Sequence, residues 1–439
     1  MSQARQSEPS DGWQFRRSEG LGTPVGMPCK CRASVGDLPY SVSMAILQLR
    51  PATPFVLRVG YNDHRSVLDV LRGKEIDGAR VPVDVLVMEA HWAQRHRELV
   101  KEAAVGRQLV LDCRVDLWTL DGASALPPGR TNAYTIDEIH RDAKEIVRDV
   151  LTIQDHAVWT IAPACHVGDF SGPAWNTTLR LLDETIDQSG SLPWAKIVGT
   201  PAALATRENA GRIRDELLAR RIQHLVLTIG PIQNDRDGEN VLHLVRALSA
   251  AGLRVHLTHQ GAFGLAALAV GAQSFDGGLL GRVQTFDYEQ QRQRLSGNNV
   301  MRAPKPRGYA APLLSSIPKD ILVKLFQLKA VRAALECDGP CCHTRIDGAA
   351  LYPVTHFVVC RSAQVRKVLD VPPEMRLGQV QTLYDQTETI YTAIRGVRRG
   401  DRNALEATEL DTLSRQVAPV MAARRQLRKV VDSAHWAAS

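Results

Sequence analysis

The sequence predicts an α/β fold, a TIM-like (β/α)₈ barrel followed by a largely helical C-terminal region. Eight short, strand-like apolar runs recur along the chain, and amphipathic stretches such as 207–221 and 239–252 separate them. Repeated strand–helix units form parallel sheets with right-handed crossovers, and eight of them can close a barrel. An open doubly wound sheet is the alternative, but no GxGxxG follows the first run and no P-loop occurs. The runs cover 55–60, 84–89, 108–112, 157–162, 195–199, 222–230, 254–259 and 272–276.

The order of the elements divides the chain into three parts. Residues 1–50, with Ser, Gly and Pro scattered through them, predict a loosely ordered N-terminal segment. Residues 51–330 contain the predicted barrel. Within it, the polar, Pro- and Gly-bearing stretch 287–312 predicts a long excursion or a linker. Helical patterning dominates residues 331–439, which also contain a cluster of cysteines.

Composition excludes several classes of protein. Hydrophobic residues make up 44% of the chain and charged residues 23%, as in soluble globular proteins, and no run of apolar residues is long enough to span a bilayer. The first residues lack the apolar core of a signal peptide, so we expect a cytoplasmic protein with reduced cysteines. A net charge of +7 weakly favours an anionic partner such as nucleic acid. The basic run at 414–433 is interpreted as a solvated helix face rather than a nucleic-acid contact.

Four carboxylates fall at or near the ends of predicted strands. Asp112 follows QLVL, Asp276 follows AQSF and precedes two glycines, Glu89 follows DVLVM, and Asp169 lies in ACHVGDF. The carboxyl ends of barrel strands meet at one mouth, which is the geometry that a nucleophile and a separate acid/base need. Helix capping is an equally common role for an aspartate at the end of a strand and stays open as the alternative.

A second constellation consists of cysteines and histidines near the C-terminus. Three thiolates and one imidazole would form a closed, tetrahedral, structural zinc site with no position for water. We assign the ligands to Cys337, Cys341, Cys342 and His356. His343 or Cys360 could replace one of them, and unliganded thiols are the alternative because adjacent cysteines rarely bind one ion.

These two constellations, in this order, resemble the tRNA-guanine transglycosylase superfamily, a (β/α)₈ barrel with a zinc site near its C-terminal end. The family's motif FDCVxPTR is similar to FDGGLLGR, which puts Phe275, Asp276 and Arg282 in register. The preceding pattern GxGTPxDLLxAVxxGxDxFD resembles HQGAFGLAALAVGAQSFD. Upstream, LTDSGGFQ resembles VLDCRVDLW, with Asp112 in the place of the acid/base Asp. The resemblance covers about residues 84–395.

The resemblance implies a pentosyltransferase that exchanges bases within a nucleic acid. Asp276 would attack the anomeric carbon of a guanosine nucleotide to form a covalent glycosyl intermediate, and Asp112 would manage the proton on the bases. The target nucleotide would have to leave its stack. Asp169 is the candidate for hydrogen-bonding the base edge, Gly230 would let backbone approach the base, and Arg282 would grip phosphates.

Several positions depart from the family pattern. The pocket Gln of IVQGG is Gly199 here, which we keep as a substrate-binding position, the GG of AxGGLAVGE is reduced to Gly230, and CxCxxC has become CxxxCC. These departures are similar to those of relatives that insert 7-deazaguanine bases into DNA, so we favour DNA slightly over tRNA as the partner. An accessory protein is a further possible partner. Two alternatives stay open: another barrel enzyme acting on a small molecule, and a catalytically inert nucleic-acid-binding subunit.

Overall fold

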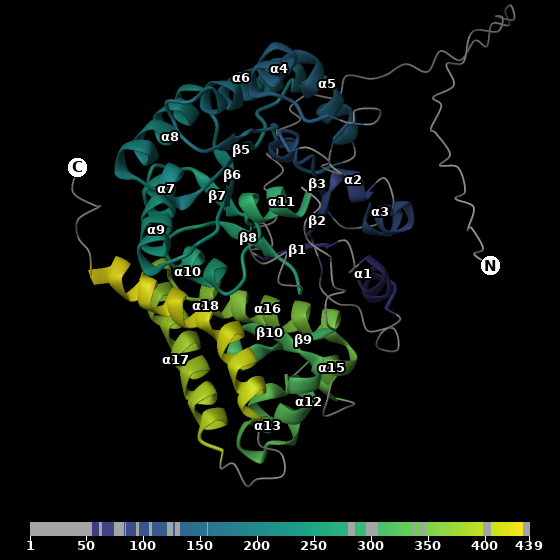
Figure 1. Cartoon of the computed structure of the whole chain (residues 1–439), viewed down its shortest axis with the longest axis vertical. Coiled ribbons are helices and arrows are strands. Elements are labelled where there is room, and N and C mark those ends of the chain that lie inside the picture. Colours follow the sequence, from purple (N-terminus) through teal and green to yellow (C-terminus); the bar gives the residue numbers. More distant parts are fainter. Residues whose placement is uncertain are drawn as a thin grey trace, which may run out of the picture. The chain divides into compact units, whose positions relative to one another are not determined.

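A curled sheet of eight parallel strands is the centre of the structure, a computed structural model (Figure 1). The structure describes residues 55–60, 64–73, 83, 85–93, 96–104, 108–120, 126–127, 132–155, 157–279, 286–295, 306–337, 339–343, 348–397 and 405–432. The predicted N-terminal segment, residues 1–50, lies outside these ranges. The strands are β1 (Phe55–Arg58), β2 (Val85–Glu89), β3 (Gln108–Asp112), β4 (His166–Val167), β5 (Ala195–Gly199), β6 (His224–Ile229), β7 (Arg254–Leu257) and β8 (Ser274–Gly277).

The first strand lies between the last strand and the second, because the order across the sheet is β3-β2-β1-β8-β7-β6-β5-β4. Val56 of β1 is opposite Asp276 of β8, and Leu57 of β1 is opposite Leu86 of β2. Pairing of the first and last strands brings elements that are about 220 residues apart in sequence into one ladder. The parallel α/β class is therefore confirmed, and seven of the eight predicted runs overlap strands.

The prediction of a fourth strand at 157–162 is wrong. Only Ile161 makes a bridge, to Trp194, and the strand itself begins later, at His166. The amide group of Gln154 explains the difference, since it accepts from the Ile161 N–H at 2.9 Å and donates to the carbonyls of Ile161 at 3.1 Å and Leu111 at 3.2 Å. A side chain thus takes the backbone groups that a strand ladder would use. The Val158 N–H also donates to the Leu109 carbonyl at 2.9 Å.

The two faces of the sheet differ because alternate residues of a strand point to opposite sides. One set of alternating residues packs against the surrounding helices. The other set is apolar toward the amino ends of the strands, where Trp159 stacks on Trp194 at 4.2 Å among buried valines. At the carboxyl ends of the strands, the same set consists of charged residues. The valines of this layer are Val56, Val85, Val87, Val110 and Val226.

The helices between the strands begin at recognisable sequence signals. Thr135 and Glu138 form a capping box, Thr206 caps the next predicted helix, and Asn234 caps the one after it. Gly271, with φ of +115°, ends the short apolar helix before β8. These helices are α1 (His64–Leu71), α2 (Ala90–Ala93), α3 (Arg97–Ala104), α4 (Ile136–Arg141), α5 (Ala143–Ile153), α6 (Pro173–Ser189), α7 (Pro201–Leu204), α8 (Arg207–Ala219), α9 (Asp235–Ala250) and α10 (Phe263–Ala269).

The C-terminal region is mostly helical, as predicted. The predicted polar excursion contains α11 (Tyr288–Leu295) and strand β9 (Arg307–Ala310), which pairs antiparallel with β10 (Ser315–Pro318). The later helices are α12 (Lys319–Gln327), α13 (Lys329–Leu335), α14 (Pro340–His343), α15 (Gly348–Leu351), α16 (Pro353–Leu369), α17 (Arg376–Arg395) and α18 (Ala407–Asp432).

The helices α16, α17 and α18 pack on the sheet and on α9 and α10, and parts of α17 and α18 also join a second apolar cluster with α12 and α13. Phe357 of α16 contacts the Phe55 ring edge-on at 5.6 Å, and the Tyr384 hydroxyl of α17 donates to the Ala262 carbonyl at 2.9 Å. Among the described helices, none combines the length and apolar character needed to cross a membrane.

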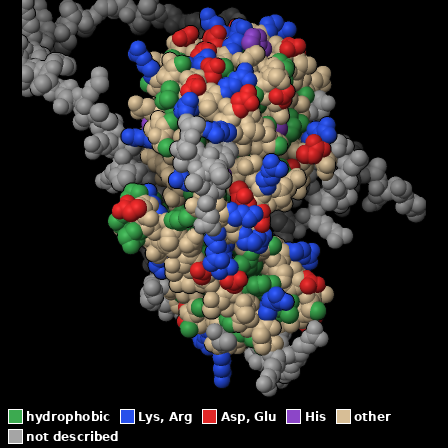
Figure 2. All heavy atoms as spheres, turned by 90° about the vertical axis from the view of Figure 1, so that its left-hand side faces the viewer, with side chains coloured by type: hydrophobic (Ala, Val, Ile, Leu, Met, Phe, Trp, Pro, Cys, Tyr) green, Lys and Arg blue, Asp and Glu red, His purple; other side chains and the backbone are tan. Residues whose placement is uncertain are grey.

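The basic run of α18 binds acidic residues of neighbouring helices. Arg425 pairs with Asp235 at 2.9 Å and Lys429 with Glu239 at 2.6 Å, both on α9, while Arg424 pairs with acidic groups of α17. On this side of the molecule, basic and acidic side chains are interspersed rather than segregated (Figure 2). The interpretation of the run as a helix face, not a nucleic-acid contact, agrees with this pairing.

Candidate functional site

The side chain of Asp276, at the carboxyl end of β8, is fully buried and held by three elements. Arg58 at the end of β1 donates from Nε to Oδ1 at 2.7 Å and from Nη2 to Oδ2 at 2.9 Å. The Nε2 of His256, on β7, lies 3.1 Å from Oδ2, and the backbone N–H of His259 donates to Oδ1 at 2.8 Å. Each oxygen of the Asp276 carboxylate therefore has two hydrogen-bond partners.

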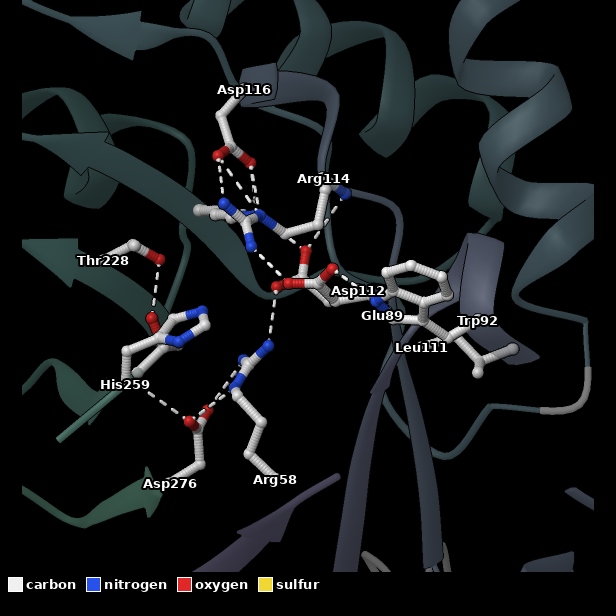
Figure 3. Close-up of polar contacts among 12 residues, drawn as sticks. Arg58, Glu89, Trp92, Leu111, Asp112, Arg114, Asp116, Thr228, His259 and Asp276 are labelled. Carbon is white, nitrogen blue, oxygen red and sulfur yellow. Dashed lines mark hydrogen bonds and ion pairs between the residues drawn. The ribbon is translucent and has the colours of Figure 1, made fainter. Parts of the chain in front are cut away.

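Asp112, at the carboxyl end of β3, shares Arg58 with Asp276. Its Oδ2 accepts from Nη1 of Arg58 at 3.4 Å, and its Oδ1 accepts from Lys196 Nζ at 2.7 Å. The two carboxylates predicted to carry the chemistry thus lie on the two sides of one guanidinium (Figure 3). The structure brings these residues together, and their catalytic roles stay predictions.

A second ion cluster adjoins the first. Arg114, in a left-handed backbone conformation with φ of 51°, binds Asp116 through Nε and Nη2 and binds Glu89 through Nη1. Lys196 joins the two clusters, since its Nζ lies 3.0 Å from Asp116 as well as 2.7 Å from Asp112. Four carboxylates and three cations therefore meet near the carboxyl ends of β1, β2, β3 and β8, and Lys196 reaches them from the start of β5.

These ion pairs keep the carboxylates ionised. Burial alone would raise the pKa of Asp276, but the charges and hydrogen bonds of Arg58 and His256 outweigh it and hold that pKa well below its usual range. Burial likewise opposes ionisation of Asp112, but the charges of Lys196 and Arg58 outweigh burial and lower the pKa of this carboxyl group. The pKa of Asp116 is lowered to about 2 because Arg114 and Lys196 overcome its burial.

His259, just after β7, differs from its neighbours because its ring nitrogens have no hydrogen-bond partner among the described residues. The side chain is 5% exposed, and neither ring nitrogen has a hydrogen-bond partner in the described part of the chain. Burial, followed by the charges of Arg58 and Arg114, lowers the pKa of His259 to about 3, so the imidazole is neutral at pH 7. In Figure 3 the ring lies among the charged side chains, and the dashed line at this residue runs from its backbone.

Two cavities open beside this cluster. The larger, about 720 Å³, reaches His259 and is bounded by the loops after β6 and β7, the start of α11, β10 and one side of α18. The smaller, about 470 Å³, lies over the ends of β4, β5 and β6 and is lined by His166, Thr200 and Tyr288 among others. Gly230, Pro231, Gln233, Asp287 and Gln290 line both cavities.

The predicted substrate-binding residues are not all placed at the cluster. Gly230 lines both cavities, and a Cβ there would lie 2.3 Å from the Phe286 carbonyl, so its close approach is to the chain's own backbone. Gly199 packs between strands, because a Cβ would lie 2.6 Å from the Val167 carbonyl. Asp169 is exposed and accepts from the Ser171 N–H at 3.0 Å, a local turn, with no described bond to the cluster. Arg282 lies outside the described residues.

Sequence reasoning missed the cationic half of the site. It singled out no basic residue of the cluster, nor Asp116, His256 or His259. A signal was present in the printed sequence, because Arg58, Lys196 and His256 each interrupt an otherwise apolar strand. A charged residue buried in such a strand needs a partner, which is a reason to search for one.

The predicted metal ligands lie together as one group. The ligand atoms of Cys337, Cys341, Cys342 and His356 are all within 4.8 Å of one another, and the Nδ1 of His356 is 3.4–3.5 Å from the three sulfurs. In a tetrahedral zinc site, bonds of about 2.0–2.3 Å put ligand atoms about 3.5–3.8 Å apart, close to this spacing. The group can hold a metal ion.

Of the two alternative ligands, Cys360 and His343, only Cys360 has a described side chain. Cys360 lies on the same helix as His356, and its sulfur is 3.5 Å from Nε2, whereas the other three sulfurs lie near Nδ1. Its thiol also interacts with that of Cys337, but Cys360 is not one of the four residues whose ligand atoms all lie within 4.8 Å of one another. The side chain of His343 lies outside the described residues. Close packing shapes the loop around the group, since a Cβ at Gly348 would lie 1.7 Å from the Cys341 carbonyl.

The chain matches no protein-family model and no curated protein. Function must therefore be inferred from the chemistry of the site itself.

Proposed function

We propose that the protein is a base-exchange transglycosylase that replaces guanine in a nucleic acid, DNA in preference to tRNA, with a 7-deazaguanine derivative. The observation that carries the proposal is the pair Asp276 and Asp112, both ionised and both bound to Arg58 at the carboxyl ends of parallel strands. In parallel α/β folds this edge of the sheet is where chemistry is found. The resemblance to the tRNA-guanine transglycosylase superfamily puts both carboxylates at its reacting positions.

The reaction would proceed in two displacements. A carboxylate oxygen of Asp276 attacks the anomeric carbon, the bond from that carbon to guanine N9 breaks, and a glycosyl ester forms. The incoming base then attacks the same carbon and releases Asp276. Guanine leaves as its N9 anion and takes a proton from water, whereas the ionised Asp112 is the group assigned to accept the N9 proton of the incoming base and return it to water, so exchange needs no net proton.

This mechanism requires the site to open. Asp276 is fully buried, and Arg58 occupies both of its oxygens. An extruded nucleotide would therefore have to draw Arg58 away from one oxygen. A phosphate of the substrate is a suitable competing partner for that guanidinium.

Two finer structural proposals accompany the function. The curled sheet would act as a closed (β/α)₈ barrel, joined between β3 and the segment before β4 by Gln154 and the Val158 N–H. The Cys and His group would bind Zn²⁺ through four protein ligands, which leaves no position for a catalytic water. A bound zinc ion would stabilise the fold of the C-terminal region rather than take part in base exchange.

A second candidate function is a catalytically inert nucleic-acid-binding subunit. The observation that favours it is the complete pairing of the buried carboxylates with Arg58, Arg114 and Lys196, which suits a structural ion network as well as a poised site.

A covalent trapping experiment separates the two candidates. The protein is incubated with guanine-containing DNA or tRNA and a 7-deazaguanine base, and denaturing electrophoresis detects any protein–nucleic acid adduct. The adduct should form with the wild type and with Asp215→Asn, a substitution at an exposed surface pair, and should be absent in Asp276→Asn. Absence of an adduct with either polymer, in folded protein, would favour the inert subunit.

A further inference from the structure

The backbone around His259 holds the carboxylate of Asp276 in place. His259 has a left-handed conformation, with φ of 57°, and its N–H donates to Asp276 Oδ1 at 2.8 Å. The next residue, Gln260, donates its N–H to the Asp276 carbonyl at 2.8 Å. A left-handed conformation is uncommon for residues other than Gly, although Asn, Asp and His adopt it more often than most, and it is often found at functional sites.

The imidazole of His259 is buried but makes no hydrogen bond with the described part of the chain. It is more than nine-tenths buried, and both ring nitrogens lack a hydrogen-bond partner in the described part of the chain. Its nearest described aromatic neighbour is Phe286, 5.9 Å away and tilted, so the ring is not stacked. The residue is one of those that line the cavity of about 720 Å³. A buried polar group in this position is expected to have a partner from outside the chain.

The chemistry of that partner follows from the state of the ring. Because burial and the nearby Arg58 and Arg114 lower the pKa of His259 to about 3, the ring offers one N–H donor and one nitrogen acceptor at pH 7. The two guanidinium groups make the surroundings unfavourable for a cation. A neutral nitrogen heterocycle with adjacent donor and acceptor groups, such as a purine-like base, matches this ring.

We infer that His259 binds the heterocyclic base of the substrate through its imidazole, and that its backbone N–H links this contact to the orientation of Asp276. The inference rests on the proposed function, because the ligand is taken to be the exchanged base. His259 would be a substrate-contacting residue, and the fixed turn at 259–260 would be the positioning device.

The test uses 7-deazaguanine as the probe and compares the wild type with His259→Gly. Glycine adopts the left-handed conformation without strain, so the turn at 259–260 and the N–H bond to Asp276 remain while the ring is lost. We expect binding of 7-deazaguanine, measured by calorimetry, to weaken by about tenfold or more, since two hydrogen bonds are removed. Added free imidazole should occupy the vacated space and restore part of the affinity.

A spectroscopic measurement provides a readout that a structural role would not move. In ¹⁵N-histidine-labelled wild-type protein, the ring-nitrogen signals missing from His259→Gly belong to His259, and 7-deazaguanine should shift them. Unshifted signals, or equal affinity in the glycine variant, would overturn the inference.

The trapping experiment keeps the two proposals apart. An adduct that forms equally well in His259→Gly, with an unchanged KM for the base, refutes the inference and leaves the proposed function standing. Shifted His259 signals without an adduct on either polymer support the base contact and refute the exchange reaction. Neither binding nor an adduct in the wild type refutes both.

Discussion

Replacing Arg58 with methionine should destabilise the protein strongly at neutral pH. Arg58 is 2% exposed and donates three hydrogen bonds to two buried carboxylates, Asp276 and Asp112. Removing one partner of a buried ion pair costs about 3–5 kcal/mol, because the remaining charge is left without compensation. This cost is a large part of the total free energy of unfolding expected for a folded domain, about 5–15 kcal/mol.

The effect of pH on this variant has a definite sign. In the wild type the pKa of Asp276 is lowered, so its ionisation stabilises the folded protein at pH values above the pKa of an unfolded carboxyl group. That stability is lost as the pH falls from there toward the lowered folded-state pKa. Without Arg58, burial is the dominant influence and the folded-state pKa rises, so stability is lost as the pH increases instead. The deficit of Arg58→Met relative to the wild type should therefore be largest at pH 7 and smaller near pH 4.

Urea unfolding at the two pH values measures this directly. Arg58→Lys, which keeps the charge but loses the planar fork, should fall between the wild type and the methionine variant. Arg214→Met, at an exposed surface pair, should leave the unfolding midpoint unchanged. A loss below about 1 kcal/mol at pH 7, or an equal loss at both pH values, would refute the account of Arg58 as the shared partner of two buried carboxylates.

Three further measurements address the metal group, the contacts of Gln154, and His259. Metal analysis should find about one zinc ion per chain in the wild type and in Cys360→Ser but less in Cys341→Ser, which should also melt at a lower temperature; equal zinc in the two variants would contradict the ligand assignment. Gln154→Met leaves three buried backbone groups without partners and should lower the free energy of unfolding by about 2–4 kcal/mol in urea, whereas a change within error would show that water replaces the amide. Because the pKa of His259 is about 3 against 6.5 when unfolded, this group should cost the wild type about 2 kcal/mol between pH 6.5 and 4.5, and His259→Asn should lose less over the same interval; parallel pH profiles would disprove the depressed pKa.

The strands could be predicted because their signal is local. Short apolar runs bounded by turn residues are typical of buried parallel strands, and seven such runs overlap strands. The run at 157–162 has the same local character, yet Gln154 binds its backbone and Trp159 stacks on Trp194. Contacts made by a side chain outside the run, even one only seven residues away, do not show in the hydrophobic pattern.

The acidic half of the site could be predicted and the basic half could not. Asp112 and Asp276 end their strands, and the rule that strand ends converge holds for any parallel sheet. Arg58 and Lys196 lie in strands that are otherwise apolar, and alternation alone does not say which face of the sheet is the inner one. Their partners come from other strands, 218 residues away in the case of Arg58 and Asp276.

By itself, the sequence determined the parallel α/β class, the carboxylates that end β3 and β8, and the group of cysteines near the C-terminus, because each depends on residues that are close together in the chain. Only the tertiary structure decided that one guanidinium joins Asp112 to Asp276, that Cys360 lies beside Nε2 of His356 and outside the group of four ligand atoms, and that the ring nitrogens of His259 are buried with no hydrogen-bond partner among the described residues. These properties depend on which side chains meet when distant strands pair, and the direction and burial of a side chain are set by that pairing.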